Sequence, residues 1–415
     1  MRAMATTLDP KRTIAELEEL RAFSADENGA QRIAFTPMWV KVREWLRAKL
    51  ATLPVETHVD AAGNLWSTLK GRSEKCVLIG GHMDSVPNGG WLDGCLNVLA
   101  GVEVLRRVAA QYDGVPPVTV RLVDWADEEG ARFGKSLFGS SACSGNLDMD
   151  EARGLVDRDG IRLPDALKLV GIDFEKVKDS HRELANAVAY LELHIEQGPV
   201  LLDLDLPLGV VLGTFGVERH AITFRGQAAH SGSTPMNRRR DAFLAAARLS
   251  PEIYEIAKRH GGVCTIGSCT TKPGIVTSVV EECRITLDQR NLDAAALARL
   301  YADARAASER FAAEGNVDVA WERLWSIEPV LFDEQLKRFC EEAIVETCGR
   351  VHRLPSGPLH DAAEVARAGV PTVMMFVQSL HGISHNKIED TKEEHLELCV
   401  RAFDTLAEKT IRAHA

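Results

Sequence analysis

The stretch Val77-Leu78-Ile79-Gly80-Gly81-His82-Met83-Asp84 begins with an apolar run and ends in side chains that can carry chemistry. The run has the length and composition of a buried strand. A glycine-rich loop with Asp93 follows it, and the periodic segment Leu96–Ala110 then predicts a helix. A strand, a polar loop and a helix in this order indicate an α/β domain.

Three more apolar segments predict strands, at Val118–Trp125, Ala189–Ile195 and Val370–Val377. Residues 10–52 carry a helical apolar period, and further helical patterns lie between the strands. Strands that alternate with helices predict a mixed, largely parallel sheet with flanking helices.

The pattern changes in the middle of the chain. From there we predict strands and helices in the order His220–Phe224, Asp241–His260, Gly262–Ile266, Ile275–Leu287, Asp293–Glu314 and Val317–Arg323. This β-α-β-β-α-β order is the split pattern of ferredoxin-like domains. We therefore expect residues 213–329 to form an α+β domain, inserted into an α/β domain made of residues 1–212 and 330–415.

The composition excludes several classes of protein. The 415 residues include 49 Lys+Arg and 60 Asp+Glu, a net charge of −11 that disfavours binding to nucleic acid or to anionic membranes. No apolar run approaches the roughly 18–20 residues of a membrane helix, and the N-terminus lacks the apolar segment of a secretory signal. Nine cysteines without a C-x-x-C pair indicate reduced core residues rather than disulfides or a cysteine-bound zinc. We expect a cytoplasmic protein that acts on a small molecule.

Histidine or acidic residues follow all four predicted strands of the α/β domain. Ligands bind at the carboxyl ends of strands in open α/β sheets, so we expect these side chains to lie close together. The residues are His82, Asp84 and Asp93 after the first strand, Asp127, Glu128 and Glu129 after the second, His194 at the end of the third, and His385 after the fourth.

Each of these residues has a plainer interpretation when it is taken alone. Asp93 could cap a helix, Asp127–Glu129 could be a solvated face, and a single histidine is more often structural than a ligand. Their convergence on four strand ends favours a metal site instead. Two histidines, one Asp and one Glu suffice for one ion, and a fifth candidate indicates two ions with a bridging carboxylate.

Two further roles follow from spacing. Asp84, two residues after His82, is placed to orient that imidazole. In the adjacent pair Glu128 and Glu129, one carboxylate can bind metal while its neighbour transfers protons.

Together these residues resemble a known family. The sequence is similar to the zinc-dependent amidohydrolases of the hydantoinase/carbamoylase type, within the di-metal aminoacylase and carboxypeptidase superfamily. That group includes N-carbamoyl-L-amino-acid hydrolase, allantoate amidohydrolase and β-ureidopropionase. The matching segments are Gly81–Gly94, Asp127–Phe133, Leu193–Pro199, Gly226–Met236 and Gly382–His385.

The resemblance implies a ligand set and a catalytic base. Zinc is the expected metal; manganese, cobalt and nickel are alternatives because histidine and carboxylate sites discriminate modestly between them. Two ions per subunit would be held by Asp93 as the bridge, by His82 and His194 on one ion, and by Glu129 and His385 on the other, with Glu128 as the general base.

The resemblance also implies substrate-binding residues and a homodimer formed through the inserted domain. His230 resembles the residue that reaches the partner's active site and stabilises the oxyanion. Gln197 resembles a substrate-binding amide, and Arg290 the arginine that pairs with a substrate carboxylate. His360 resembles a pocket residue. Thr277 stands where the family usually has an asparagine and lacks the two donors of that amide, so it bears on substrate choice.

The implied activity is metal-dependent hydrolysis of the linear amide C–N bond of an N-carbamoyl amino acid. Allantoate hydrolysis and the deacylation of N-acyl amino acids are alternatives within the same class. A non-catalytic metal-binding homologue is the alternative from another class, and the complete ligand set with Glu128 disfavours it.

Overall fold

The computed structural model describes residues 8–415, in which the chain forms two compact units. One unit holds the residues up to Leu212 together with Phe332–Ala415, and the other is Gly213–Leu331. The prediction that the N-terminus lacks a secretory signal involves residues 1–7, which lie outside the described residues. Among residues 8–415, every helix is too short or too polar to span a bilayer. The nine cysteines are free thiols.

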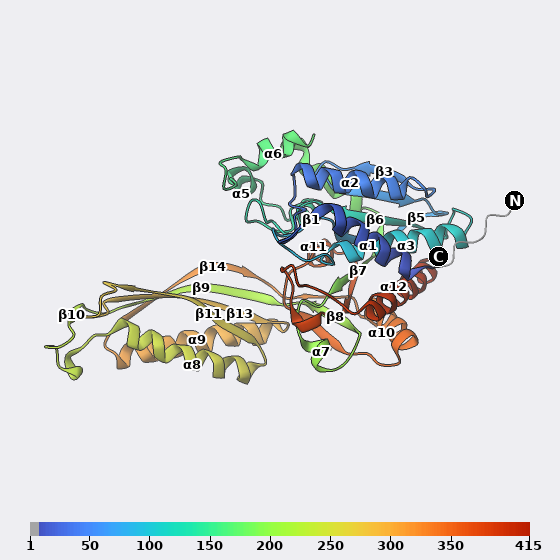
Figure 1. The fold of residues 1–415 in the computed structure, drawn as a ribbon. Coiled ribbons are helices and arrows are strands. Elements are labelled where there is room, and N and C mark those ends of the chain that lie inside the picture. Colours follow the sequence, from blue (N-terminus) through green and yellow to red (C-terminus); the bar gives the residue numbers. More distant parts are fainter. Residues whose placement is uncertain (1–7) are drawn as a thin grey trace. The chain divides into compact units, whose positions relative to one another are not determined.

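A mixed sheet forms the centre of the first unit (Figure 1). Its middle is parallel and consists of β17 (Thr372–Val377), β7 (Ala187–Ile195), β5 (Ser73–His82) and β6 (Val118–Trp125), which lie side by side in this order. Antiparallel strands extend it: β8 (Leu208–Thr214) with β16 (Arg353–Ser356) beyond β17, and β4 (Leu65–Leu69) with β3 (Glu56–Val59) beyond β6. This arrangement confirms the predicted fold class.

Helices bury their apolar faces against this sheet and against one another. The largest core joins the sheet to α1 (Pro10–Ser24), α2 (Pro37–Leu50), α3 (Cys95–Gln111), α10 (Glu334–Cys348) and α12 (Glu393–His414). A smaller core joins α2 to α4 (Phe138–Ser144), α5 (Met149–Gly154), α6 (Leu163–Leu169) and the 3₁₀ segment η1 (Phe174–Leu184). The remaining helices of the unit are α7 (Val200–Asp203), η3 (Leu380–Gly382) and α11 (Asp361–Arg367).

A short hairpin interrupts the helical stretch that we predicted for residues 10–52. Strands β1 (Ala25–Asp26) and β2 (Gly29–Ala30) pair between α1 and α2. Gly29 has a φ of 130°, and an added Cβ would lie 2.7 Å from the carbonyl oxygen of Gly89, so the turn requires glycine. The dipeptide Asn28–Gly29 is a turn signal, and the continuous helical prediction was wrong at this point.

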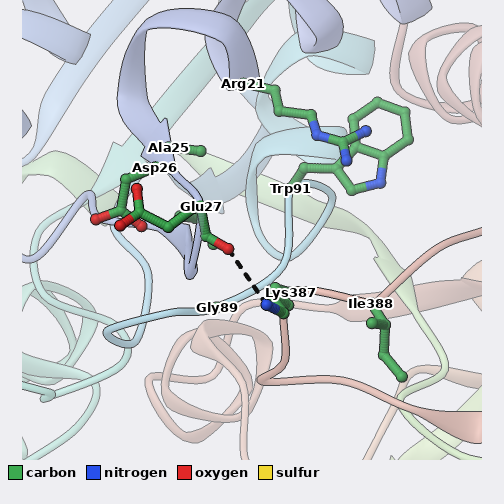
Figure 2. A pocket seen from close by; sticks show the side chains of 10 residues that line it. Arg21, Ala25, Asp26, Glu27, Gly89, Trp91, Lys387 and Ile388 are labelled. Carbon is green, nitrogen blue, oxygen red and sulfur yellow. Dashed lines mark hydrogen bonds between the residues drawn. The ribbon is translucent and has the colours of Figure 1, made fainter.

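The hairpin lines a cavity of about 320 Å³ in the first unit (Figure 2). The guanidinium of Arg21 lies 5.2 Å from the ring centre of Trp91, and Lys387 Nζ donates to the carbonyl oxygen of Glu27 at 3.3 Å. Trp91 belongs to the loop that carries Asp93. The cavity therefore borders this loop, but none of the predicted site residues lines it.

The second unit is a four-stranded antiparallel sheet with α8 (Ala242–His260) and α9 (Ala294–Glu314) on one face (Figure 1). The strand order is β11 (Val263–Lys272), β13 (Glu282–Asn291), β9 (Gly216–Arg225) and β14 (Asp318–Ile327). The predicted split order of strands and helices is present. Shorter elements are β10 (Ala229–His230), paired with β12 (Ser278–Val279), the 3₁₀ turn η2 (Met236–Arg238) and β15 (Val330–Leu331).

The strand predicted at Ile275–Leu287 was placed too early. Residues 275–277 are exposed, and β13 instead continues to Asn291. Along β13 buried residues alternate with half-buried ones, so Cys283, Ile285 and Leu287 face the helices. The apolar residues Ile275 and Val276 misled the prediction because they lie in a loop.

Candidate metal centre

The four parallel strands of the first unit bring the predicted ligands to one edge of the sheet. His82 is the last residue of β5, and His194 is the last but one of β7. Glu129 follows the end of β6 by four residues, and His385 follows β17 and the turn η3. Neighbouring parallel strands end on the same side, so their following loops converge.

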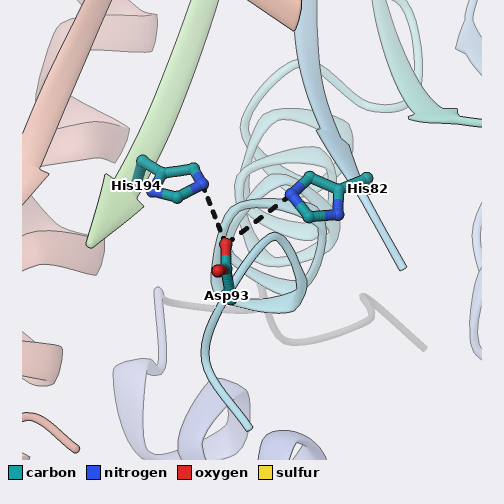
Figure 3. A group of neighbouring side chains, drawn as sticks. All are labelled: His82, Asp93 and His194. Atoms are coloured by element: carbon teal, nitrogen blue, oxygen red, sulfur yellow. Dashed lines mark ion pairs between the residues drawn. The ribbon is translucent and has the colours of Figure 1, made fainter. Parts of the chain in front are cut away.

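Asp93 lies between two groups of possible ligands. The first group is His82, Asp93 and His194, and the second is Asp93, Glu129 and His385; within each, the nitrogen and oxygen atoms lie within 4.8 Å of one another. Oδ1 of Asp93 is 3.1 Å from His194 Nε2 and 3.7 Å from His82 Nε2 (Figure 3). Oδ2 of Asp93 is 3.4 Å from His385 Nε2, which is also 3.4 Å from Glu129 Oε2. Each carboxylate oxygen of Asp93 thus faces one group, as a bridge requires.

Burial and charge shift the pKa values of these groups strongly. Burial lowers the pKa of His82 to about 4 and raises that of Glu129 to about 8. Burial also acts to lower the pKa of His194, but the bond to Asp93 and its charge outweigh it and raise the pKa to about 9. The bond to Asp93 likewise raises the pKa of His385 to about 9. Glu129, His194 and His385 therefore stay protonated near neutral pH unless bound cations offset the negative charge of the carboxylates.

The donor set fits a pair of divalent ions. His82 Nε2 and Glu129 Oε1 are buried and have no hydrogen-bond partner within residues 8–415. An unpaired buried polar atom is costly, and both atoms belong to the two ligand groups. Imidazole nitrogens and carboxylate oxygens are ligands of zinc and of other transition metals. These residues could hold one ion in each group, with Asp93 shared.

Glu128 is placed beside the ligands without belonging to either group. Its Oε2 lies 3.8 Å from His82 Nε2. Burial raises the pKa of Glu128 well above its usual value, and the charges of Asp361 and Glu129 raise it further. A carboxylate with a raised pKa next to a metal site suits proton transfer.

The carboxylate of Asp84 contacts the backbone of the loop that carries Glu128 and Glu129. The predicted contact with His82 runs through the backbone, since His82 Nδ1 lies 3.2 Å from the carbonyl oxygen of Asp84 and 3.7 Å from its carboxylate. The carboxylate itself accepts the backbone N–H groups of Glu128 at 3.3 Å and Glu129 at 3.2 Å. Asp127, which precedes them, has a φ of 57°. Asp84 therefore holds the tight turn that carries both glutamates.

Gln197 lies at the centre and contacts the shared carboxylate. Its Nε2 donates to Asp93 Oδ2 at 2.9 Å and to Ser384 Oγ at 3.0 Å, and its φ is 59°. Ser384 in turn contacts Asp93 Oδ2 at 3.2 Å and Glu389 Oε2 at 2.8 Å. Glu389 is buried, and its Oε1 accepts the backbone N–H of Asp93 at 3.1 Å.

Ser384 and Glu389 were missed by the sequence analysis. The only signal was their place in the segment that contains His385, one residue before it and four residues after it. Both side chains hold the loop of Asp93 in position.

His360 precedes α11 in the first unit and lies next to a predicted ligand. The centres of the His360 and His194 rings are 4.4 Å apart, and His360 Nε2 is 2.9 Å from Ser356 Oγ. Burial keeps the pKa of His360 well below its usual value. The ring is therefore neutral and borders the first ligand group.

The other predicted residues belong to the second unit, where they lie in two separate places. His230 in β10 is exposed and pairs with Ser278 of β12, and the N–H of Ser231 donates to the carbonyl oxygen of Thr277 at 2.9 Å. Arg290 lies near the far end of β13, eight residues beyond the strand's first residue. At about 3.4 Å per residue, Arg290 lies roughly 27 Å from Glu282, the first residue of β13. Strand β10, which holds His230, lies beyond that end of the sheet (Figure 1).

Comparisons with known proteins identify the family. The model of the peptidase family M20/M25/M40 matches residues 78–409. The chain belongs to this family. It is 37% identical to the N-carbamoyl-L-amino acid amidohydrolase of Geobacillus stearothermophilus over 88% of this chain and 90% of the relative. It is 34% identical to the allantoate amidohydrolase of Escherichia coli K12, covering 90% of this chain and 91% of the relative.

A solved structure agrees with these relatives. The hydantoinase/carbamoylase family amidase of Burkholderia multivorans superposes with a TM-score of 0.87 at 31% identity, over 97% of this chain and 98% of that one. The predicted resemblance and the predicted class, a hydrolase of linear amide C–N bonds, are confirmed.

Proposed function

We propose that the chain is a two-metal amidohydrolase that removes the carbamoyl group of an N-carbamoyl amino acid. One observation carries the proposal: two groups of metal ligands share Asp93, and Glu128 lies 3.8 Å from His82 beside them. Relatives from the N-carbamoyl amino acid and allantoate hydrolases support the same class of substrate.

In this proposal the chain's own side chains handle the protons. Bound divalent ions lower the pKa of water and polarise the carbonyl group of the substrate. Glu128 accepts a proton from the attacking water, because its carboxylate is buried beside the ligand groups without belonging to either of them. A C–O bond forms, Glu128 returns the proton to the leaving nitrogen, and the C–N bond breaks. The amino acid and carbamic acid are formed, and carbamic acid decomposes to ammonia and carbon dioxide as its remaining C–N bond breaks.

We also propose that the active form is a homodimer in which His230 acts on the partner's substrate. His230 Nδ1 accepts the backbone N–H groups of Gly232 and Ser233 at 3.1 and 3.2 Å, so Nε2 carries the proton and can donate to an oxyanion. Arg290 lies roughly 27 Å from the end of β13 beyond which β10 lies, so one small substrate cannot touch His230 and Arg290 of a single chain. Val276, which is 96% exposed, lies beside Thr277 and offers apolar surface for a second chain.

Several finer assignments belong to the proposal. Zinc is the metal we expect, with manganese, cobalt and nickel as alternatives, and a cytoplasmic location is expected. Gln197 and His360 border the ligands and would contact the substrate, while Thr277 would contact it from the partner. Arg290 would bind its carboxylate. Allantoate and N-acyl amino acids are alternative substrates, and a non-catalytic metal-binding homologue is the alternative from another class.

A substrate screen tests the proposal. The metal-loaded protein is assayed against N-carbamoyl amino acids, allantoate, ureidopropionate and N-acyl amino acids. We expect the highest kcat/KM with an N-carbamoyl amino acid. A higher value with allantoate or an N-acyl amino acid would reassign the substrate, and stoichiometric metal without turnover on any of them would support the non-catalytic homologue.

A further inference from the structure

Two cysteines of the second unit lie close enough to react with each other. Cys269 of β11 is exposed and Cys283 of β13 is buried, and their Sγ atoms are 3.7 Å apart. Both are free thiols. The sulfur atoms of a disulfide are about 2.05 Å apart, so the pair has to close by about 1.7 Å.

The position of β11 permits this movement. Cys269 pairs with Ile285 and Cys283 pairs with Thr271, so the cysteines are diagonal neighbours on adjacent strands. Diagonal neighbours have Cα atoms about 7–8 Å apart, slightly more than the roughly 7 Å that a disulfide tolerates. β11 is at the edge of the four-stranded sheet, and its register shifts just before Cys269. A bulged edge strand can bend, so a small approach of β11 to β13 closes the gap.

The two thiols differ in their access to solvent. Cys269 is exposed and can meet a dissolved oxidant. Cys283 packs in the core of the unit with Ile285 and Leu287, where burial raises the pKa of its thiol to about 12. A buried, protonated thiol is a poor nucleophile toward oxidants. The exposed cysteine is therefore the one to react first, and the buried cysteine is placed to react with its product.

The segment between the two cysteines holds the strand of His230. The carbonyl oxygen of Thr277 accepts the N–H of Ser231 at 2.9 Å, and Ser278 of β12 pairs with His230 of β10. The cysteines are 14 positions apart, on the two strands from which this segment leaves the sheet. A covalent bond between them would close the segment into a ring.

We propose that Cys269 and Cys283 form a site of reversible oxidation, at which a hydroperoxide converts both thiols to a disulfide that braces the segment holding His230. The bond forms whether or not the chain hydrolyses an amide, so its test needs no substrate. Disulfides of cytosolic proteins are usually transient and often serve redox sensing. A thiol reductant reverses this one by attack on the exposed sulfur of Cys269.

The reaction has two balanced steps. The Cys269 thiolate attacks one oxygen of hydrogen peroxide, the O–O bond breaks, and a sulfenic acid forms. The hydroxide that leaves takes up the proton lost by the Cys269 thiol and becomes water. The Cys283 sulfur then attacks the Cys269 sulfur, the S–O bond breaks, and the oxygen leaves with the Cys283 proton as a second water. Two thiols lose two electrons, which the peroxide gains.

One tryptic peptide reports on the pair. Trypsin cleaves after Arg259 and Arg284 but not after Lys272, which precedes a proline. Residues 260–284 therefore form one peptide, which contains both members of the pair and also Cys264. Cys264 belongs to β11 as well and is the internal control.

The folded protein is treated with hydrogen peroxide, and then unfolded, alkylated and digested. We expect the peptide to carry a single alkyl group, on Cys264, and to lack the two thiol hydrogens of the pair. Dithiothreitol should restore three alkylated cysteines. A link that includes Cys264, a link between two chains, three alkylated cysteines after peroxide, or over-oxidation of Cys269 without a link would each overturn the proposal.

Three variants test the order of the two steps. In Cys269→Ser, the buried Cys283 should remain alkylatable after peroxide. Cys283→Ala keeps the core apolar and should leave a sulfenic acid on Cys269, which dimedone traps. Cys264→Ser should form the link as the wild type does. If Cys283→Ala fails to fold, Cys269→Ser, at an exposed position, decides alone: oxidation of Cys283 at the wild-type rate would overturn the assigned roles.

Hydrogen exchange tests the brace itself. In the oxidised protein the amides of β10 and β12 should exchange about tenfold more slowly than in the reduced protein, because the ring limits local opening. Cys269→Ser treated in the same way should show no change. Equal exchange in the oxidised and reduced wild type would overturn the brace.

Discussion

Three predicted ligands of the first unit are buried and His385 is exposed, whereas His230 and Thr277 lie on the surface of the second unit. His82, Asp93 and His194 are each at most 3% exposed, while His230 and Thr277 are exposed. In the first unit, packing sets the distances and burial displaces the pKa values. In the second unit, His230 Nδ1 accepts two backbone N–H groups.

This difference separates two kinds of site. In our proposal, the two ligand groups of the first unit are complete within one chain and need only cations. An exposed imidazole at one end of a sheet acts only when a substrate or a second chain is brought to it. The first unit can therefore be tested as a preformed metal site, and the second unit as the source of a side chain for the partner's site.

Removal of the metals should give the largest effect. A chelator is expected to lower turnover at least about 10³-fold, because bound ions supply several kcal/mol of stabilisation to the transition state. The far-UV circular dichroism should change little, since the hydrophobic cores of both units exclude the ligands. Turnover is measured before and after chelation and again after divalent ions are restored. Full activity in the chelated protein would contradict the preformed metal site.

Replacement of the proposed base should reduce the rate without emptying the site. Glu128→Gln keeps the size of the side chain and removes the proton acceptor, so kcat should fall roughly 10²- to 10⁴-fold. Metal content should remain near that of the wild type, because Glu128 belongs to neither ligand group. Glu129→Gln is the matched comparison and should lose metal. If Glu128→Gln loses metal and Glu129→Gln retains it, the two roles are exchanged.

Complementation between subunits tests the second unit. His230→Ala should lower kcat by about 10²- to 10³-fold, as the loss of an oxyanion donor does. Mixed with Glu128→Gln chains, it should regain about a quarter of wild-type activity. Half of randomly assorted dimers are mixed, and each has one competent site when His230 acts in trans. No recovery after verified subunit exchange would show that His230 is not donated by the partner.

The stability of the metal-free protein should depend on pH in a direction set by the buried ligands. The pKa of Glu129 is raised to about 8 and that of His194 to about 9, so both groups hold protons more tightly in the folded chain. Their contribution to stability is full at low pH and is lost as the pH rises through these values. Between pH 6.5 and pH 9, the midpoint of thermal unfolding should fall by roughly several degrees. Bound metals deprotonate their ligands and should remove this fall; an equal fall with metals bound would contradict the assignment.

The ends of the strands were predictable, because an apolar run followed directly by polar residues can be recognised within a short stretch of sequence. The apolar run Val118–Trp125 coincides with β6, and an acidic pair after a buried strand is conspicuous in the sequence. Ser384 and Glu389 were not predictable, since a serine and a glutamate in a loop are ordinary. Their role depends on contacts with Asp93 and its neighbours, which lie almost 300 positions away in the chain.

The arrangement within the second unit needed the structure for a similar reason. The sequence places His230 and Arg290 in one domain, but only the strand register shows that Arg290 pairs with Val217 at the start of β9, whereas His230 follows the other end of β9, at Arg225. The partner of Arg290 was also hidden, because an Asp two residues away becomes a bidentate partner only when both side chains share a face.

The central claim is that Asp93 bridges two ions, and the metal content of two variants tests it most directly. Elemental analysis after reconstitution should find two ions per chain in the wild type, none in Asp93→Ala and about one in Glu129→Ala, because Asp93 belongs to both ligand groups and Glu129 to one. Equal metal content in the two variants, or two ions retained in Asp93→Ala, would contradict the shared carboxylate and with it the two-metal centre.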